Sequence, residues 1–201
     1  MSSPVRIENA IISCFDKTGL DVFARGLVKA VPGVRIYSTG GTLKFLADIP
    51  GMKKHLKAIE EYAEFAEMPG GLVKTLHPMI HAGLLAEAGN KEHEAYMANH
   101  GIKHFQLVVV NLYSFGAMKK KGFEAARSHI DIGGPAMIRA AAKNFMKVAV
   151  LVSPSQYRPF LESLGDGSCS LDARFGLAKQ AFAATAAYEA EISDYFGKAG
   201  L

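Results

Sequence analysis

The stretch that most constrains this chain is residues 130–144, which read IDIGGPAMIRAAAKN. Its two glycines leave the backbone free for tight geometry, and the proline after them suits the first position of a helix. The alanine-rich run that follows forms helix readily. The N–H groups at a helix start attract anions, so the stretch could form a ligand site. It could equally be an ordinary capped core helix. In the second case Asp131 belongs to the turn, and Lys143 interacts with the dipole at the helix C-terminus.

Strand-like and helical patterns alternate along the rest of the chain. Residues 7–14, 34–37, 107–112 and 147–152 are apolar and β-branched, as in buried strands. Helical spacing or composition is found over residues 18–31, 90–100 and 154–164, and residues 74–85 suggest a loop that runs into a helix. Residues 53–66 have no clean period. Such alternation predicts an α/β fold with a parallel sheet between helices.

A long helix is expected to close the sequence, with Ser170 as its cap. Its apolar positions are Leu171, Phe175, Ala178, Phe182, Ile192 and Phe196. Their helical spacing predicts that this face packs on the rest of the chain or on a second copy.

Two loops that follow expected strands carry small, polar and charged residues. The first contains Asp16-Lys17-Thr18, and the second is Thr39-Gly40-Gly41-Thr42. In α/β sheets ligands bind beyond the carboxyl ends of the strands. Two helix starts that converge on a phosphate would explain both loops, although ordinary helix caps have the same composition.

Other polar residues also lie where a ligand could be bound. His77 and His81 have the i, i+4 spacing that zinc ligands can have, but no HExxH motif joins them, which favours structural or substrate-edge roles. Asn111 and Tyr113 come at the end of the most hydrophobic strand, where a packed strand end and a functional edge are both possible.

Composition limits the partners of the chain. There are 23 Lys and Arg against 19 Asp and Glu, a formal net charge of +4, and no run is as dense as nucleic-acid binding requires. Two cysteines make no disulfide framework, and no apolar run approaches the roughly 20 residues that span a membrane. No signal peptide is evident. We therefore expect a reduced, cytoplasmic protein that binds neither nucleic acid nor membrane.

Five motifs occur in the order SCFDKTGL, STGGT, GGLVKTLHPMIHAGLL, VVVNLY and IDIGGPAMIRAAAKN. Together they resemble the IMP cyclohydrolase domain of the bifunctional purine-biosynthesis enzyme, and LAKQAFAATAAYEAEISDYF resembles the end of that domain. The resemblance implies a methylglyoxal-synthase-like parallel sheet flanked by helices, with a C-terminal helical extension. It implies one domain over residues 1–201, in which a phosphate-binding core ends at about residue 145 and a strand and helices follow.

The implied reaction closes 5-formamidoimidazole-4-carboxamide ribotide to inosine monophosphate with loss of water, without a metal or other cofactor. The site must hold the two reacting groups in contact, stabilise an oxyanion and move protons. By resemblance Lys143 transfers protons, Asp131 holds or activates the reacting groups, and Lys74 and Tyr113 stabilise charge on an oxygen. If residues 135–144 form a regular helix, Lys143 lies roughly 12 Å along the axis from its start. Asp131 and Lys143 would then address opposite ends of the substrate, unless the helix bends.

The resemblance also implies the residues that bind the substrate. The phosphate is expected to bind at Ser13, Asp16, Lys17, Thr39, Gly40, Gly41 and Thr42. The base is expected to contact Thr75, Val110, Asn111, Asp131 and Ile132, with Gly133 and Gly134 beside them.

Three positions depart from the family pattern. Leu72 stands where the family usually has arginine, Phe15 where it has serine, and Ser114 where it has proline. The first two could weaken or shift ligand binding, or leave the contacts there to backbone groups.

The resemblance further implies a homodimer, and a separate formyltransferase that supplies the substrate. Two other functions are compatible with the same fold. One is a methylglyoxal-synthase-like lyase, which offers no role for KTLHP or RAAAKN, and the other is a non-catalytic sensor of purine nucleotides.

Overall fold

The computed structural model describes residues 4–65, 68, 73–87, 89–113 and 115–199. Its centre is a five-stranded sheet in the order β4-β3-β2-β5-β6, in which every neighbouring pair is parallel. The strands are β2 (Asn9–Cys14), β3 (Arg35–Ser38), β4 (Leu56–Ala58), β5 (Leu107–Asn111) and β6 (Ala149–Leu151). The predicted α/β class with a parallel sheet is therefore confirmed.

Side chains of the central strands alternate between two cores, one on each face of the sheet. In β2, Ala10 and Ile12 belong to one core and Ile11 to the other, and in β5 Val109 and Val110 divide in the same way. Successive residues of a strand point to opposite faces, and a sheet covered on both sides needs apolar residues at both sets of positions. This requirement explains the continuous hydrophobic runs in the sequence.

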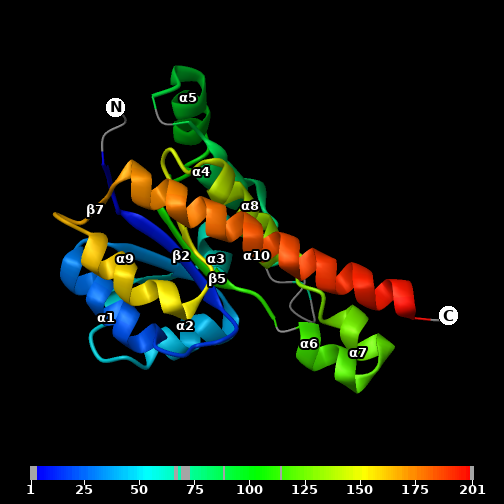
Figure 1. Ribbon diagram of the computed structural model, residues 1–201. Coiled ribbons are helices and arrows are strands. Elements are labelled where there is room, and N and C mark those ends of the chain that lie inside the picture. The colour runs from blue at the N-terminus through cyan, green and yellow to red at the C-terminus, as the bar shows by residue number, and fades with distance from the viewer. Residues whose placement is uncertain (1–3, 66–67, 69–72, 88, 114, 200–201) are drawn as a thin grey trace.

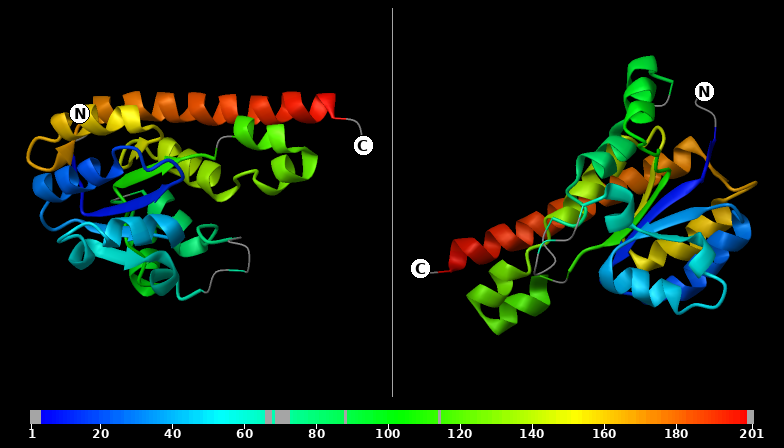
Figure 2. Two further views of the ribbon diagram at one scale, coloured as in Figure 1. Left: turned by 90° about the horizontal axis from the view of Figure 1, so that it is seen from below. Right: turned by 180° about the vertical axis from the view of Figure 1, so that it is seen from behind.

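Helices cover both faces of the sheet (Figures 1 and 2). The first core includes side chains of α1 (Leu20–Ala30), α2 (Gly40–Ala47) and α9 (Tyr157–Ser163). The second includes side chains of α3 (Ile59–Ala63), α4 (Pro78–Leu85), α8 (Gly133–Lys143) and α10 (Leu171–Lys198). The sheet is thus the middle layer of three.

The remaining elements lie outside these layers. Helix α5 (Lys91–Asn99) is one, and α6 (Phe115–Met118) and α7 (Phe123–Ser128) lie beside the distal half of α10 (Figure 1). Strands β1 (Val5–Arg6) and β7 (Ser168–Cys169) form an antiparallel pair, and 3-10 turns occur at Lys53–His55, Lys119–Lys121 and Pro154–Gln156. None of the described helices combines the length and apolar character that crossing a membrane requires.

Helix α10 begins at the predicted cap, since the Ser170 hydroxyl accepts a hydrogen bond from the Ala173 N–H at 3.2 Å. Only part of the predicted face is buried within the chain, and packing of the rest on a second copy stays a prediction. Phe175, Phe182 and Phe196 are exposed, whereas the buried positions are Arg174, Ala178, Ala181, Thr185 and Tyr188. The reason is that α10 packs on the alanine-rich α8, and a close approach of two helices requires small side chains.

The predicted boundary near residue 145 falls between α8 and β6. Strand β6 pairs with β5 inside the main sheet, and α10 packs on the core of that sheet. The C-terminal part of the chain is therefore continuous with the core, and its division into two parts stays a prediction.

Candidate functional site

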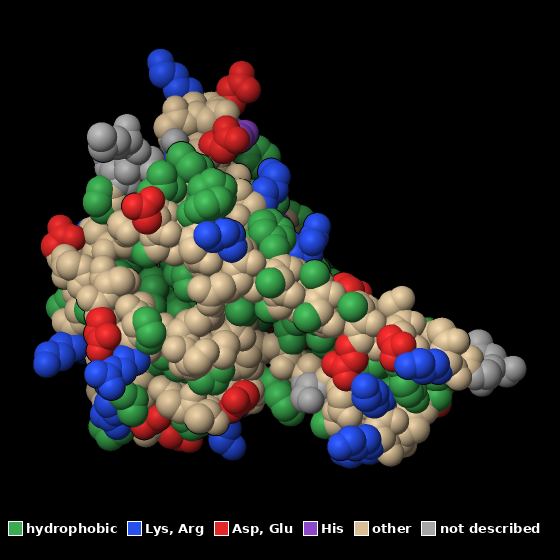
Figure 3. All heavy atoms as spheres, viewed as in Figure 1, with side chains coloured by type: hydrophobic (Ala, Val, Ile, Leu, Met, Phe, Trp, Pro, Cys, Tyr) green, Lys and Arg blue, Asp and Glu red, His purple; other side chains and the backbone are tan. Residues whose placement is uncertain are grey.

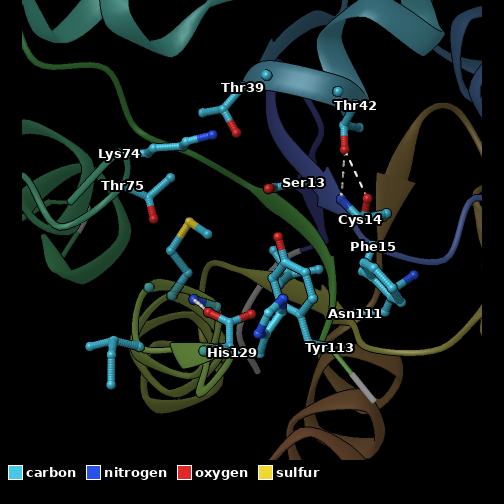
Figure 4. Close-up of a pocket in the computed structure, with 18 of the residues that line it drawn as sticks. Ser13, Cys14, Phe15, Thr39, Thr42, Lys74, Thr75, Asn111, Tyr113 and His129 are labelled. Atoms are coloured by element: carbon cyan, nitrogen blue, oxygen red, sulfur yellow. Dashed lines mark hydrogen bonds between the residues drawn. The ribbon is translucent and has the colours of Figure 1, made fainter. Parts of the chain in front are cut away.

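A cavity of about 710 Å³ lies at the carboxyl edge of the sheet. The register pairs Ile12 of β2 with Ser38 of β3, and Cys14 of β2 with Asn111 of β5, so the loops after these three strands begin at the same edge. The first turn of α8 lines the cavity as well (Figure 4). The topology thus gathers segments that are widely separated in the sequence, as expected for this class of sheet.

Most of the predicted site residues line this cavity. They are Ser13, Lys17, Thr39, Gly40, Gly41, Thr42, Lys74, Thr75, Val110, Asn111, Tyr113, Asp131, Ile132, Gly133 and Gly134. Asp16 and Lys143 are the two predicted residues that do not line it.

Asn111 fixes the loop that follows β2. Its amide oxygen accepts the Asp16 N–H at 2.9 Å, and its amide nitrogen donates to the Asp16 carbonyl at 2.7 Å. The Asp16 carboxylate accepts the Thr18 N–H at 2.9 Å. Hydrogen bonding to Thr18, first to its side chain and then to its backbone, lowers the pKa of Asp16. Asn111 therefore uses both polar atoms of its side chain to hold the loop, and Asp16 serves as a local turn residue. The expectations that Asn111 grips a base and that Asp16 binds phosphate stay predictions.

Thr42, in the first turn of α2, holds this turn against the end of β2. Its hydroxyl accepts the Cys14 N–H at 3.1 Å and donates to the Cys14 carbonyl at 2.9 Å. Because both roles of the hydroxyl are taken, Thr42 supports the start of α2 from within the protein. Thr39 is the N-cap residue of α2, and its side chain makes no capping hydrogen bond. Its hydroxyl points toward the Lys74 amine in Figure 4.

Two amines bring positive charge to the cavity. The Lys17 amine donates to the carbonyls of Cys14 and Phe15, each at 3.3 Å. The Lys74 amine lies 3.2 Å from the position that a Cβ on Gly40 would occupy, at the first residue of α2. Because a helix start carries partial positive charge, the start of α2 suits an anion.

Asp131 lies at the opposite helix start, that of α8. Its carboxylate accepts the Gly134 N–H at 2.8 Å, and its own N–H donates to the Tyr188 hydroxyl at 2.8 Å. Burial raises the pKa of Asp131 above the ordinary carboxyl value, although the Gly134 bond opposes the shift. Among the described residues, the second carboxylate oxygen has no hydrogen-bond partner.

The two glycines of the motif are required by close contacts. A Cβ on Gly133 would lie 2.7 Å from the Thr75 hydroxyl, and a Cβ on Gly134 would lie 2.6 Å from the Asp131 carboxylate. Both separations are far shorter than van der Waals contact. The glycines therefore let Thr75 and Asp131 lie directly against the first turn of α8.

Comparisons with known proteins agree with this architecture. The family model described as MGS-like domain matches residues 19–137, more than half of the chain. A second model, described as AICARFT/IMPCHase bienzyme, matches residues 141–200. The crystal structure of ForH has a TM-score of 0.82 at 34% identity and covers 94% of this chain and 97% of ForH.

The chain belongs to the MGS-like domain family.

Relatives of this MGS-like chain include proteins named bifunctional purine biosynthesis protein PurH. That of Bradyrhizobium diazoefficiens is 48% identical over 199 residues, covering 97% of this chain, and that of Ruegeria sp. is 47% identical over 203 residues, covering 98%. The chain spans 37% of the length of each relative. The predicted resemblance to one part of a bifunctional purine-biosynthesis enzyme is confirmed.

Lys143 lies outside the cavity of this MGS-like chain. It is the last residue of α8 and is exposed, whereas the cavity is lined by Gly133, Gly134 and Met137 of the same helix. At 1.5 Å per residue, Lys143 lies about 9 Å along the axis beyond Met137, more than a lysine side chain spans. The helix runs without interruption from Gly133 to Lys143. The proton-transfer role of Lys143 stays a prediction.

The two histidines considered as metal ligands have other surroundings. The His77 ring accepts the Met79 N–H at 3.3 Å and so caps α4, and burial lowers the pKa of His81. Within the described ranges no group of three or more His, Cys, Asp or Glu side chains could hold a metal ion.

Several cavity residues were not predicted from the sequence. His129, two residues before Asp131, lines the cavity, and its Nδ1 lies 2.8 Å from the Ala125 carbonyl. Cys14 also lines the cavity. Its thiol lies 3.6 Å from the Tyr157 hydroxyl, and burial raises the pKa of this thiol to about 11. His129 could have been found from the sequence, because it directly precedes residues 130–144, which contain Gly133 and Gly134. Nothing in the sequence singled out Cys14, which is part of a strand.

Of the three departures from the family pattern, the described residues include one. Phe15 lines the cavity, and its ring lies against that of Tyr113. Leu72 and Ser114 lie outside the described residues.

Proposed function

We propose that this chain is an IMP cyclohydrolase that closes 5-formamidoimidazole-4-carboxamide ribotide to inosine monophosphate with loss of water. The observation that carries the proposal is one cavity that is lined by the loops after β2 and β3 and also by Asp131 and Tyr113. Its volume of about 710 Å³ lies within the roughly 300–1,000 Å³ typical of ligand sites. Relatives named as purine biosynthesis proteins support the same assignment.

The phosphate of the substrate is proposed to bind at the start of α2. Backbone N–H groups of the Thr39–Thr42 segment would donate to its oxygens, as helix starts do for anions. The amines of Lys17 and Lys74 add positive charge at this end. The Ser13 side chain lines the same end of the cavity.

The base is proposed to lie at the start of α8, where the ring closes. The carboxamide nitrogen attacks the formyl carbon, and Asp131 accepts a proton from that nitrogen. Its raised pKa suits this role because a general base works best when its pKa approaches the working pH. The N–H groups of the first α8 turn and the Tyr113 hydroxyl donate to the oxygen that becomes negative. The oxyanion takes up the proton held by Asp131 and becomes a hydroxyl. A second proton, lost from the former formamide nitrogen, converts this hydroxyl into the water that leaves.

Lys143 is proposed to take part in the proton transfers, as the family resemblance implies. This role requires that the amine of Lys143 approach a cavity, either by a rearrangement or in a second copy of the chain. A homodimer is proposed on separate grounds. Phe175, Phe182 and Phe196 are 48%, 40% and 40% exposed along α10, and clustered exposed apolar side chains mark association surfaces. Figure 3 shows apolar side chains among mixed charges on the projecting arm that contains α10.

The setting proposed is the cytoplasm, consistent with two buried thiols, Cys14 and Cys169, that are not paired in a disulfide. The substrate carries a formyl group, so a formyltransferase must act before this step. The family model that matches residues 141–200 is described as AICARFT/IMPCHase bienzyme, a name that joins two enzymes.

The test is to titrate the purified chain with inosine monophosphate and then to follow ring closure by absorbance in the presence of a chelator. Binding and closure together support the proposal. Binding without closure favours the nucleotide sensor. In a separate assay with a triose phosphate, formation of methylglyoxal without ring closure in the first assay favours the lyase. Complete loss of activity in the chelator would contradict a metal-free reaction.

A further inference from the structure

Asp131 is held by a residue of the C-terminal helix. Its backbone N–H donates to the hydroxyl of Tyr188, 57 positions later in the sequence, at 2.8 Å. Its carboxylate is held separately, by the Gly134 N–H. The hydrogen bond to Tyr188 fixes the backbone of Asp131, and the bond to Gly134 fixes its side chain. Together they determine where the carboxylate lies at the wall of the cavity.

The ring of Tyr188 is itself fixed by packing. Tyr188 is 7% exposed, and its ring meets that of Phe115 edge-on, with centroids 6.5 Å apart and planes at 80°. Ala126 of α7 completes this small buried cluster. An ion pair between Lys119 and Glu191, with nitrogen and oxygen 2.8 Å apart, also joins this region to α10. The hydroxyl that accepts the Asp131 N–H therefore has little freedom to move.

We propose that Tyr188 is a positioning residue, which acts from the C-terminal helix to hold Asp131 in its reactive place. The inference rests on the proposed function. Without the hydroxyl, a half-buried N–H loses its acceptor, and such groups are costly to leave unpaired. The segment before α8 would turn to find another partner and would carry the carboxylate with it. Tyr188 does not line the cavity and is not proposed to touch the substrate.

The test variant is Tyr188→Phe, which keeps the ring and its contact with Phe115. Turnover should fall by about 10-fold or more, since a misplacement of about 1 Å can cost about 10²-fold. The Michaelis constant should change little, because the phosphate end of the cavity is untouched. In an Asp131→Asn background the same substitution should have no further effect on turnover, because the hydroxyl acts through the carboxylate.

Tyr195→Phe is the matched control. It removes a phenol hydroxyl from the same helix, and the Tyr195 ring also meets Phe115, with centroids 5.5 Å apart. Its turnover should equal that of wild type. If Tyr188→Phe keeps wild-type turnover, or if its loss persists in the Asp131→Asn background, the inference is wrong.

A measurement on the wild-type chain needs neither a variant nor activity. The Asp131 amide should exchange its hydrogen slowly, although it precedes the first residue of α8, because Tyr188 accepts its hydrogen bond. Rapid exchange of that amide would overturn the inference whatever the enzyme does. An inactive wild type with a protected Asp131 amide would instead overturn the proposed function, and the catalytic role of Tyr188 with it.

Discussion

The ring of Phe15 lies against the ring of Tyr113, with centroids 4.6 Å apart and planes tilted by 39°. Phe15 follows β2 and Tyr113 follows β5, and these strands are neighbours in the sheet. Both rings remain about half exposed at the cavity, so the contact between them restricts the phenol of Tyr113 (Figure 4). Phe15, which stands where the resemblance implies a serine, thus lies against one of the four residues proposed for the chemistry.

We expect Phe15→Ala to lower turnover by about 2- to 10-fold, the equivalent of the roughly 0.5–1.5 kcal/mol of an aromatic pair. The reason is that Tyr113 gains rotamer freedom. In a Tyr113→Phe background the substitution should have no further effect on turnover. Tyr96→Ala is the control, since Tyr96 is similarly exposed on α5 and stacks on His100. Equal losses in both backgrounds would contradict the proposed link to the Tyr113 hydroxyl.

Gly133→Ala should destabilise the protein by about 1–3 kcal/mol, as overpacking in a close contact does. The new Cβ would lie 2.7 Å from the hydroxyl of Thr75, which is buried. Gly176→Ala is the matched control, because nothing lies within 4 Å of a Cβ there. That variant should be as stable as wild type or more stable, since alanine favours helix. Denaturant unfolding measures both, and equal stability of the two variants would refute the close contact.

Asp131→Asn should make the folded chain more stable near neutral pH. Burial raises the pKa of Asp131, so the folded state holds this proton more tightly than the unfolded state. Stability then falls as pH rises from the ordinary carboxyl pKa through the raised one, and the amide avoids that loss. The advantage of Asn over Asp should therefore shrink on acidification. Melting curves over this pH range measure it, and an advantage that grew toward acid would reverse the sign that burial requires.

Lys143→Arg tests the acid–base role that the resemblance implies. Arginine keeps the charge but does not lose its proton in this pH range. If Lys143 transfers protons, turnover should fall by about 10²–10⁴, while the affinity for inosine monophosphate changes little. A variant that retained more than about a third of wild-type turnover, far above that range, would limit Lys143 to the helix end where it lies.

The sequence predicted the central strands and the helices around them because buried strands and amphipathic helices have strong periodic patterns. It did not predict β4, whose three residues are partly buried or exposed, nor α6 and α7, which are too short for a clear period. It also did not predict which positions of α10 are buried within the chain. The fully buried Arg174 donates hydrogen bonds to the carbonyls of Phe145, Met146 and Cys169, and such pairing with distant backbone groups leaves no trace in a local pattern.

The site was predictable where residues follow strands directly. Ser13, Thr39 and Asn111 lie at the carboxyl ends of neighbouring strands, and a parallel sheet brings such ends together. The sequence could not reveal that Asn111 and Thr42 use their polar atoms inside the protein, since those partners are fixed only by the fold. It could not place Lys143 either, because the orientation of α8 decides which of its ends meets the cavity.

The most direct test of the proposed reaction is the turnover number of wild type and of Asp131→Asn, measured beside their dissociation constants for inosine monophosphate. The account predicts that wild type closes the ring, and that the variant loses about 10²–10⁴ in turnover, the usual size of a general acid–base contribution. The dissociation constant should change little, because the phosphate binds at the other end of the cavity. A wild type that binds inosine monophosphate but does not close the ring would contradict the account, as would an Asp131→Asn variant with wild-type turnover.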